Sequence, residues 1–280
     1  LFHVLNQYPR GTSNMKLSIS NIAWDHTQNE QIYELMKKYG FYGLEIAPTI
    51  IFPENPYSQI INAKKWADEI KSKYGFIISS MQSIWYGRQE MIFGSESERR
   101  SLIEYTKEAI NFAELIGCKN LVFGSPKNRR LFSDSDYEVG IDFFRTIGDY
   151  AYKHNTIIAM EANPSIYGTN YINYTKSAIE LVKVVNSKGF MLNIDIGTMI
   201  ENKESITILR NNVDLINHVH ISEPFLRPII KRDLHKEIIH LLQDEGYSNY
   251  ISIEMAKLSN IKIIESIMEY VSGIVVDEKF

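Results

Sequence analysis

The feature that most constrains the fold is an unbroken alternation of short β-rich segments with long segments of helical periodicity. A strand followed by a helix and another strand of the same kind gives parallel pairing with a crossover helix. Eight such units point to a closed barrel instead of an open sheet, and no Pro/Gly/Ser-rich linker marks a second domain. The sequence therefore predicts an α/β fold, a single (β/α)8 TIM barrel over residues 15–280. The expected strands are 16–22, 43–47, 77–82, 120–124, 157–161, 190–195, 217–222 and 250–254.

Glycines recur just before several of the expected strands, where a helix should end. Glycine is favoured there because it adopts the left-handed conformation that commonly closes a helix. We expect this role for Gly40, Gly75, Gly117, Gly189 and Gly246. Residues 1–14 lack the periodic pattern that begins at Met15, so we treat them as an N-terminal extension of uncertain origin.

Composition excludes several classes of partner. The net charge is −4 and no long block of lysine and arginine is present, so nucleic acid is not expected as a partner. The single cysteine, Cys118, lies in the apolar context "ELIGCKNLVF", which indicates a buried, inert thiol and a reducing compartment. No window approaches 18 apolar residues and residues 1–14 do not read as a signal peptide, so we expect a cytoplasmic protein without a membrane partner.

Ionisable residues end four consecutive predicted strands. Glu161 ends the fifth, Asp195 the sixth and Glu254 the eighth, while His220 lies near the end of the seventh. In a (β/α)8 barrel these ends meet at one rim, where active sites are built. Any one of them alone could be a solvated loop residue or a helix cap. With all four together, the like charges of the three carboxylates would repel unless a cation lay between them, which favours a divalent metal site.

The histidines of "INHVHISEP" are two residues apart, so His218 and His220 should face the same way. His220 is nearer the rim and is the expected ligand, whereas His218 should lie one layer deeper, in packing or in a hydrogen bond to a ligand. Three carboxylates and one imidazole suit a hard to borderline ion. Mn²⁺, Mg²⁺ or Co²⁺ is favoured, with Zn²⁺ possible in principle.

This set of strand ends resembles the metal-binding pattern of the xylose isomerase-like TIM barrels, in particular their sugar isomerase/epimerase branch. "GFYGLEIAP" and "ISSMQSIWYG" are also similar to the strand ends of that family. The resemblance implies that Glu161, Asp195, His220 and Glu254 bind the metal and that Glu161 and Glu254 are the catalytic acid and base. It further implies a small-molecule sugar or sugar-phosphate substrate. The metal would acidify the C–H next to a ketose carbonyl, so that a carboxylate can remove the proton and form an enediolate.

Two departures from the family pattern concern the substrate. Many epimerases of the family carry a histidine three residues after the strand-six aspartate, and Thr198 stands there in this chain. The family's H-x-x-E is present as His220 to Glu223, but the arginine that often follows is displaced to Arg227. Glu223 and Arg227 are expected where a substrate would be bound, so metal binding should be little affected, whereas the identity of the substrate is left open.

Several other residues near the expected rim are candidates for substrate binding. Gln82 could hydrogen-bond a sugar and Trp85 could stack on one, although an aromatic residue after a strand is as often part of the core. A basic group could bind an anionic substituent or could simply be solvated; it comprises Lys127, Arg129, Arg130, Arg227 and Lys257. Glu45, on the second strand, could likewise have either a functional or a purely structural role.

Four functions remain in competition. A metal-dependent sugar isomerase or epimerase is favoured, and a lyase of the same superfamily, such as an inosose-type dehydratase, would share the first proton abstraction. A non-catalytic sugar-binding barrel is the third. An AP-endonuclease-like DNA repair enzyme is improbable, because its trinuclear zinc site needs extra histidines that "GLEIA", "SMQSI" and "DIGTM" lack. A homo-oligomer is compatible with the fold, but the sequence does not identify a surface patch that would form the interface.

Overall fold

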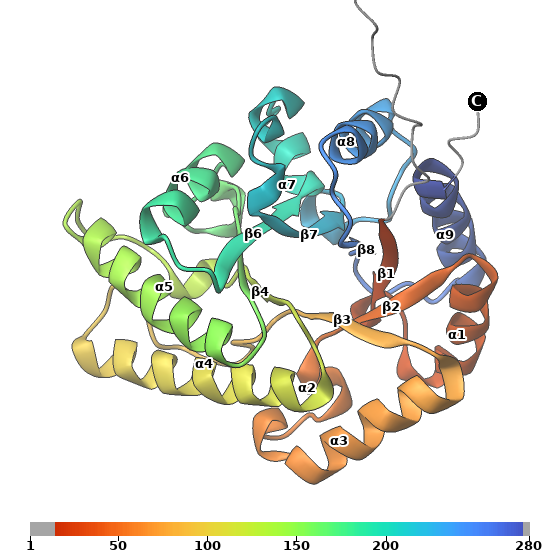
Figure 1. Cartoon of the computed structure of the whole chain (residues 1–280), viewed down its shortest axis with the longest axis horizontal. Coiled ribbons are helices and arrows are strands. Elements are labelled where there is room, and N and C mark those ends of the chain that lie inside the picture. The colour runs from red at the N-terminus through yellow and green to blue at the C-terminus, as the bar shows by residue number, and fades with distance from the viewer. Residues whose placement is uncertain (1–14, 277–280) are drawn as a thin grey trace, which may run out of the picture.

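The computed structural model describes residues 15–276 and contains a closed barrel of eight parallel strands in the order β1 to β8 (Figure 1). The predicted (β/α)8 barrel is therefore confirmed, and each expected strand is present within two residues of its predicted bounds. The predicted extension, residues 1–14, lies outside the described residues. The strands are β1 Lys16–Ser20, β2 Phe41–Ile46, β3 Ile77–Met81, β4 Leu121–Phe123, β5 Ile158–Glu161, β6 Phe190–Asp195, β7 Ile216–Ile221 and β8 Tyr250–Ile253.

Helices surround the barrel and cover the outer faces of its strands (Figure 1). The longest, α4, begins at a capping box in which Ser95 and Glu98 each accept the other's backbone N–H, and it ends at Gly117. The α-helices are α1 Asn29–Lys38, α2 Pro48–Ile51, α3 Ile60–Glu69, α4 Glu96–Ile116, α5 Asp136–Lys153, α6 Thr175–Val185, α7 Ile196–Glu201, α8 Asp233–Asp244 and α9 Ile261–Val276. Of these helices in residues 15–276, none is long and apolar enough to cross a membrane.

The two faces of the strands differ in polarity. Outward-facing residues such as Val219 and Ile221 of β7 are buried beneath the helices, whereas His218 and His220 of the same strand face the barrel interior and are also buried. The interior is unusually polar: Ser18 on β1 forms hydrogen bonds with Ser79 and Ser252, at 2.6 and 3.4 Å. Apolar packing between strands and helices therefore holds the barrel together, while its centre is free to carry charged groups.

The predicted helix-terminal glycines are confirmed at four of five positions. Gly40, Gly75, Gly117 and Gly246 have φ between 75° and 83°, the left-handed region. Gly189 was predicted wrongly, because α6 ends three residues earlier, at Asn186 with φ 49°. Asparagine tolerates this conformation because its short polar side chain can satisfy the local backbone.

Gly189 is nevertheless required, for a steric reason. A Cβ built on it would lie 2.0 Å from the backbone oxygen of Gly148 on α5. We expect Gly189→Ala to reduce the free energy of unfolding by about 3 kcal/mol, because backbone cannot move aside as a side chain can. Gly40→Ala is the matched control: its Cβ meets nothing within 4 Å, so only left-handed strain of about 1 kcal/mol remains. Urea unfolding of both variants measures the difference, and equal losses would contradict the steric explanation.

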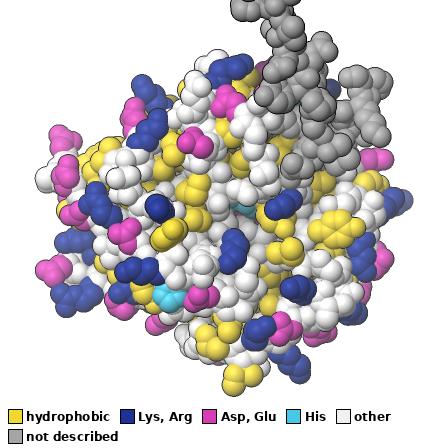
Figure 2. Space-filling model, in the orientation of Figure 1, with side chains coloured by type: hydrophobic (Ala, Val, Ile, Leu, Met, Phe, Trp, Pro, Cys, Tyr) yellow, Lys and Arg dark blue, Asp and Glu magenta, His cyan; other side chains and the backbone are white. Residues whose placement is uncertain are grey.

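The surface charges and the single cysteine are placed as the composition of the sequence suggests. On the face shown in Figure 2, Lys and Arg side chains are interspersed with Asp and Glu, so no broad patch of one sign is visible there. Cys118 is 1% exposed and its thiol donates to the backbone oxygen of Asn120. Burial raises the pKa of this thiol to about 12, which makes it the inert cysteine that the sequence predicts.

Candidate metal centre

Four side chains converge at the carboxyl ends of β5 to β8. They are Glu161, Asp195, His220 and Glu254, and each offers an oxygen or nitrogen atom within 4.8 Å of the others. All four residues come from the strand ends that the sequence singles out. The barrel thus brings together every residue of the predicted ligand set.

Strand register explains the convergence. Asp195 of β6 pairs with His220 of β7, and Glu161 of β5 pairs with Asn193, two residues before Asp195 on the same face of β6. Glu254 directly follows β8, where His220 pairs with Ser252, two residues before it. Because the barrel is closed, these inward-facing residues lie at the same height along the barrel axis, at the carboxyl ends of the strands.

His220 lies at the centre of the cluster. Its Nδ1 is 3.1 Å from Glu161 Oε1 and 3.2 Å from Glu254 Oε2, and the ring is fully buried. Its other nitrogen, Nε2, is 2.9 Å from Glu45 Oε2, on the far side of the ring from the cluster. His218 contacts the same oxygen of Glu45 through its own Nε2, at 3.0 Å, and is not part of the four-residue cluster.

Hydrogen bonds fix two of the carboxylates. Both oxygens of Glu161 accept from amides, Oε1 from Asn193 at 2.7 Å and Oε2 from Asn163 at 3.0 Å. Asp195 accepts the hydroxyl of Ser222 at 2.6 Å and caps α7 by accepting the backbone N–H of Thr198. The side chains are therefore held in their orientations before any ligand arrives.

Thr198 stands where many family epimerases carry a histidine. Its side chain is 2% exposed, and its hydroxyl donates to the backbone oxygen of Ala162 at 2.9 Å. The residue therefore links the start of α7 to the segment after β5. A threonine with this bond is a structural tie between two loops of the rim.

The pKa values of Asp195, Glu254 and His220 are shifted in the cluster. Burial, reinforced by repulsion from Glu161, raises the pKa of Asp195 to about 6. Burial likewise raises the pKa of Glu254 to about 7, despite the nearby His220. Burial would lower the pKa of His220, but the charges of Glu254 and Glu45 hold that pKa well above its ordinary value. The carboxylates thus destabilise one another's charged forms, which a cation among them would relieve.

The donor set fits a divalent ion. Carboxylate oxygens with one imidazole nitrogen are typical ligands of Mn²⁺ or Mg²⁺ and are also acceptable to Co²⁺ and Zn²⁺. Glu161 and Glu254 keep 9% and 8% of their surface exposed, so the cluster remains open on the pocket side. Such an opening is what a catalytic metal site needs for substrate.

A pocket of about 220 Å³ lies over the cluster. Its walls include Gln82, Gly124, Asn163, Tyr167 and Glu223, together with three of the four cluster residues. Gly124 matters because a Cβ there would lie 2.8 Å from an oxygen of Glu161. The pocket therefore combines charged groups at its base with polar walls, as a small polar ligand requires.

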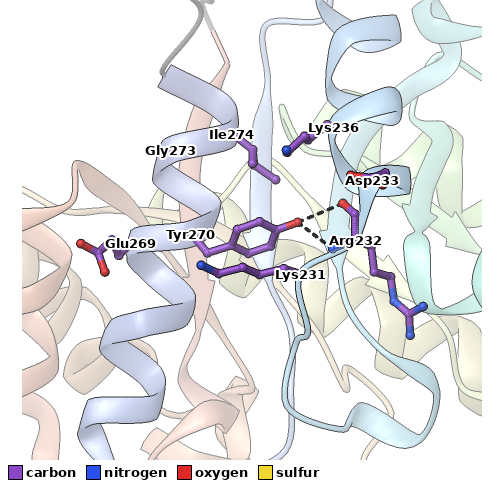
Figure 3. Close-up of a pocket in the computed structure, with 8 residues that line it drawn as sticks. All are labelled: Lys231, Arg232, Asp233, Lys236, Glu269, Tyr270, Gly273 and Ile274. Carbon is purple, nitrogen blue, oxygen red and sulfur yellow. Dashed lines mark hydrogen bonds between the residues drawn. The ribbon is translucent and has the colours of Figure 1, made fainter.

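A second cavity, of about 440 Å³, lies on the outside of the barrel between α8 and α9 (Figure 3). None of the cluster residues lines it. Tyr270 points across it and its hydroxyl bonds to the backbone of Arg232. The guanidinium of Arg232 in turn holds Glu223 with two bonds of 2.7 and 2.6 Å, so this region supports the loop after β7.

Four of the five residues predicted to bind substrate divide into two groups. Gln82 and Glu223 line the pocket over the cluster. Arg227 and Lys257 are exposed and do not line it: Arg227 lies over the ring of Phe225, and Lys257 pairs with Asp25 at 3.3 Å.

Of the two interpretations left open for Trp85, stacking on a sugar or packing in the core, the structure favours the core. Its ring is 2% exposed, its indole N–H donates to Thr106 at 2.9 Å, and its edge contacts are with Phe123 and Phe143. The ring belongs to the core between barrel and helices because its only polar atom is satisfied there.

Arg129 fits neither interpretation left open for the basic group, an anion site or a solvated loop. It is fully buried and donates to the backbone oxygen of Glu161 at 2.9 Å and to Asn163 at 2.6 Å. The guanidinium therefore supports the segment that carries Glu161. Lys127 and Arg130 remain exposed on the surface.

Sequence reasoning missed the amides that hold Glu161. Asn163 follows Glu161 by two residues and Asn193 precedes Asp195 by two. Spacing of two in a strand places residues on one face, and that signal could have identified Asn193 as an inward neighbour of the cluster. Asn163 lies beyond the strand, where spacing gives no such guidance.

The model of the xylose isomerase-like TIM barrel family matches residues 33–271. Curated protein sequences gave no match. Among solved structures, the 3-keto-D-glucoside 4-epimerase of E. coli superposes with a TM-score of 0.72 at 17% identity, covering 93% of this chain and 98% of that one. A D-psicose 3-epimerase gives a TM-score of 0.73, also at 17% identity, covering 93% and 97%.

A sugar phosphate isomerase/epimerase from Parabacteroides distasonis is similar over 96% of both chains, with a TM-score of 0.72 at 14% identity. At these identities the likeness shows a shared fold. The family model, by contrast, matches well over half of the sequence, from α1 to α9. The chain therefore belongs to the xylose isomerase-like TIM barrel family.

Proposed function

We propose that the protein is a divalent-metal-dependent isomerase or epimerase that acts on a sugar or sugar phosphate. The observation that carries the proposal is the cluster of Glu161, Asp195, His220 and Glu254 at the base of a pocket of about 220 Å³. Membership of the family and likeness to solved structures named as sugar epimerases support it.

The four cluster residues would hold the metal, which when bound would act as a Lewis acid on the substrate's carbonyl and adjacent hydroxyl. Glu161 and Glu254 would handle the proton. They contact the same atom, Nδ1 of His220, so their carboxylates lie close together at the pocket base. One removes the proton next to the carbonyl, and the other returns it to the opposite face for epimerisation or to the neighbouring carbon for isomerisation.

Polar residues around the pair would orient the substrate. The amides of Asn163 and Asn193 hold the carboxylate of Glu161, so its direction is set before substrate binds. Gln82 and Glu223 present polar groups on the pocket wall. Glu223 is kept in place by Arg232, which also balances its charge.

A substrate screen tests the proposal. Protein loaded with Mn²⁺ is incubated in D₂O with ketoses, ketose phosphates, 3-keto-glycosides and inososes, and NMR records products and deuterium uptake. We expect one class to give a new sugar stereoisomer or aldose–ketose isomer. Loss of water to an enone or diketone would identify a lyase instead, and no conversion in any class would favour a non-catalytic sugar-binding barrel.

Adding Mn²⁺ to metal-depleted protein is expected to raise the thermal unfolding midpoint, because the ion relieves repulsion among the carboxylates. At a free concentration 100 times Kd the stabilisation is about 2.7 kcal/mol. Differential scanning calorimetry with and without EDTA measures the effect. Asp195→Asn is the control, since it removes one ligand and one repulsive charge, and its midpoint should respond much less to Mn²⁺. Equal responses of the two proteins would place the bound ion elsewhere.

A further inference from the structure

Glu45 on β2 is a fully buried carboxylate on the side of His220 that faces away from the metal cluster. Its Oε2 lies 2.9 Å from Nε2 of His220 and 3.0 Å from Nε2 of His218. Its Oε1 accepts the side-chain amide of Gln82 at 3.2 Å. Three side chains from two other segments of the chain, β7 and the end of β3, thus meet at one carboxylate.

Burying a carboxylate is unfavourable unless its partners compensate for lost hydration. Here polar groups surround the carboxylate: Nε2 of His220 and Nε2 of His218 lie within 3.0 Å of Oε2, and the amide of Gln82 donates to Oε1. In the register of the barrel Glu45 pairs with Ser20 on β1 and Ser80 on β3, two small polar residues. A serine at position 45 would avoid the burial of charge, so the carboxylate calls for an explanation beyond packing.

The two nitrogens of His220 have different surroundings. Nδ1 faces Glu161 and Glu254, and Nε2 faces Glu45. A neutral imidazole carries one N–H, and only the other nitrogen can bind a metal. An ionised carboxylate can only accept a hydrogen bond, so Glu45 favours the tautomer with its proton on Nε2. That tautomer leaves the lone pair of Nδ1 directed into the cluster.

We infer that Glu45 is a positioning residue, which fixes the tautomer and ring orientation of His220 so that Nδ1 serves as a metal ligand. Gln82 donates to the other oxygen of Glu45, and Nε2 of His218 lies 3.0 Å from the oxygen that faces His220. The inference rests on the proposed metal site. It adds to that site a residue of β2 that contacts a metal ligand but is not itself a ligand. Partners of this kind typically change metal affinity by about 10–100-fold when removed.

The same three residues, Glu45, His218 and His220, also lie close enough together to hold an ion themselves. The exposed fraction of each is 0% or 1%, so this group lacks the open side that the four-residue cluster has. A positioning role and a second metal site make opposite predictions for the number of bound ions and for the nitrogen of His220 that binds one.

The test uses Mn²⁺ alone as the probe, with isothermal titration calorimetry on metal-depleted protein. We expect one ion per chain in the unchanged protein and an affinity about 10–100-fold lower in Glu45→Gln, which keeps the shape but loses the charge. Ser18→Ala is the control, because it removes a buried hydrogen bond of the barrel interior without touching either histidine; its affinity should be unchanged. Glu45→Gln binding Mn²⁺ as tightly as the unchanged protein, or two ions per chain, would overturn the inference.

Nitrogen-15 NMR of the unchanged protein loaded with Zn²⁺ shows which nitrogen of His220 carries the proton and which binds the metal. This measurement needs no variant, so it is informative even if Glu45→Gln does not fold. We expect a proton on Nε2 of His220 and metal on Nδ1, and the reverse assignment would overturn the inference. Failure of the proposed function looks different: a protein that binds Mn²⁺ with the expected Glu45 effect but converts no sugar leaves the inference intact. A protein that binds no Mn²⁺ at all refutes both.

Discussion

Replacing Glu254 by glutamine is expected to lower the rate of proton exchange at the substrate carbon by about 10²–10⁴-fold. Glutamine has nearly the same shape, so the barrel should keep its fold, but an amide cannot take up or return a proton. Glu161→Gln should have a loss of similar size, because the two carboxylates flank the same point beside His220. Rates are measured by NMR in D₂O at saturating Mn²⁺, so that weaker metal binding does not limit them.

Glu265→Gln provides the matched control for this chemistry. Glu265 lies on the outer helix α9 and pairs with Lys38 at 2.7 Å, far from the strand ends in the fold. The same loss of charge there should leave exchange unchanged. Normal exchange in metal-loaded Glu161→Gln and Glu254→Gln would refute the paired-glutamate mechanism, even if the protein proved to bind metal.

Replacing His220 by alanine is expected to abolish measurable Mn²⁺ binding, whereas His218→Ala should bind Mn²⁺ within about 100-fold of the unchanged protein. The difference follows from position: Nδ1 of His220 is in the cluster, whereas His218 lies outside it, against Glu45 and the edge of the His220 ring. His218→Ala should instead lower the free energy of unfolding by about 2–3 kcal/mol, since it leaves the buried Glu45 with one partner fewer.

Calorimetric titration with Mn²⁺ and urea unfolding separate the two effects. Metal binding lost in His218→Ala but kept in His220→Ala would mean that the inward register of β7 is misassigned. Loss in both variants with normal unfolding would indicate that the ion lies between the histidines, at Glu45. The expected pattern therefore places the ion on the rim side of His220.

Most of the fold is predictable from the sequence because each strand and helix carries its own periodic signal. All eight strands were predicted, since a barrel strand that is buried on both faces is short and rich in β-branched residues. Gly189 was mispredicted because two different demands select glycine, a left-handed helix end and a close backbone approach. The sequence does not distinguish them, whereas Asn186 and the neighbouring backbone of α5 do.

The four cluster residues were predictable because a parallel barrel brings every strand end to one rim. The network behind them was not, because the contact of Glu45 with His220 joins β2 to β7, which are not neighbours in the barrel. Trp85 and Arg129 show the same limit. An aromatic or basic residue just after a strand can turn toward substrate or into the layer beneath the helices, and only packing decides.

We propose that this barrel moves a proton on a carbon next to a carbonyl. The isotope content of the product formed in D₂O by the Mn²⁺-loaded protein tests it most directly. We predict one solvent deuterium at the inverted carbon after epimerisation, or at the carbon that gains the new C–H bond after isomerisation, and no deuterium there after metal removal. A converted product that carries no solvent deuterium, with none in the recovered substrate, would contradict proton transfer through the glutamate pair.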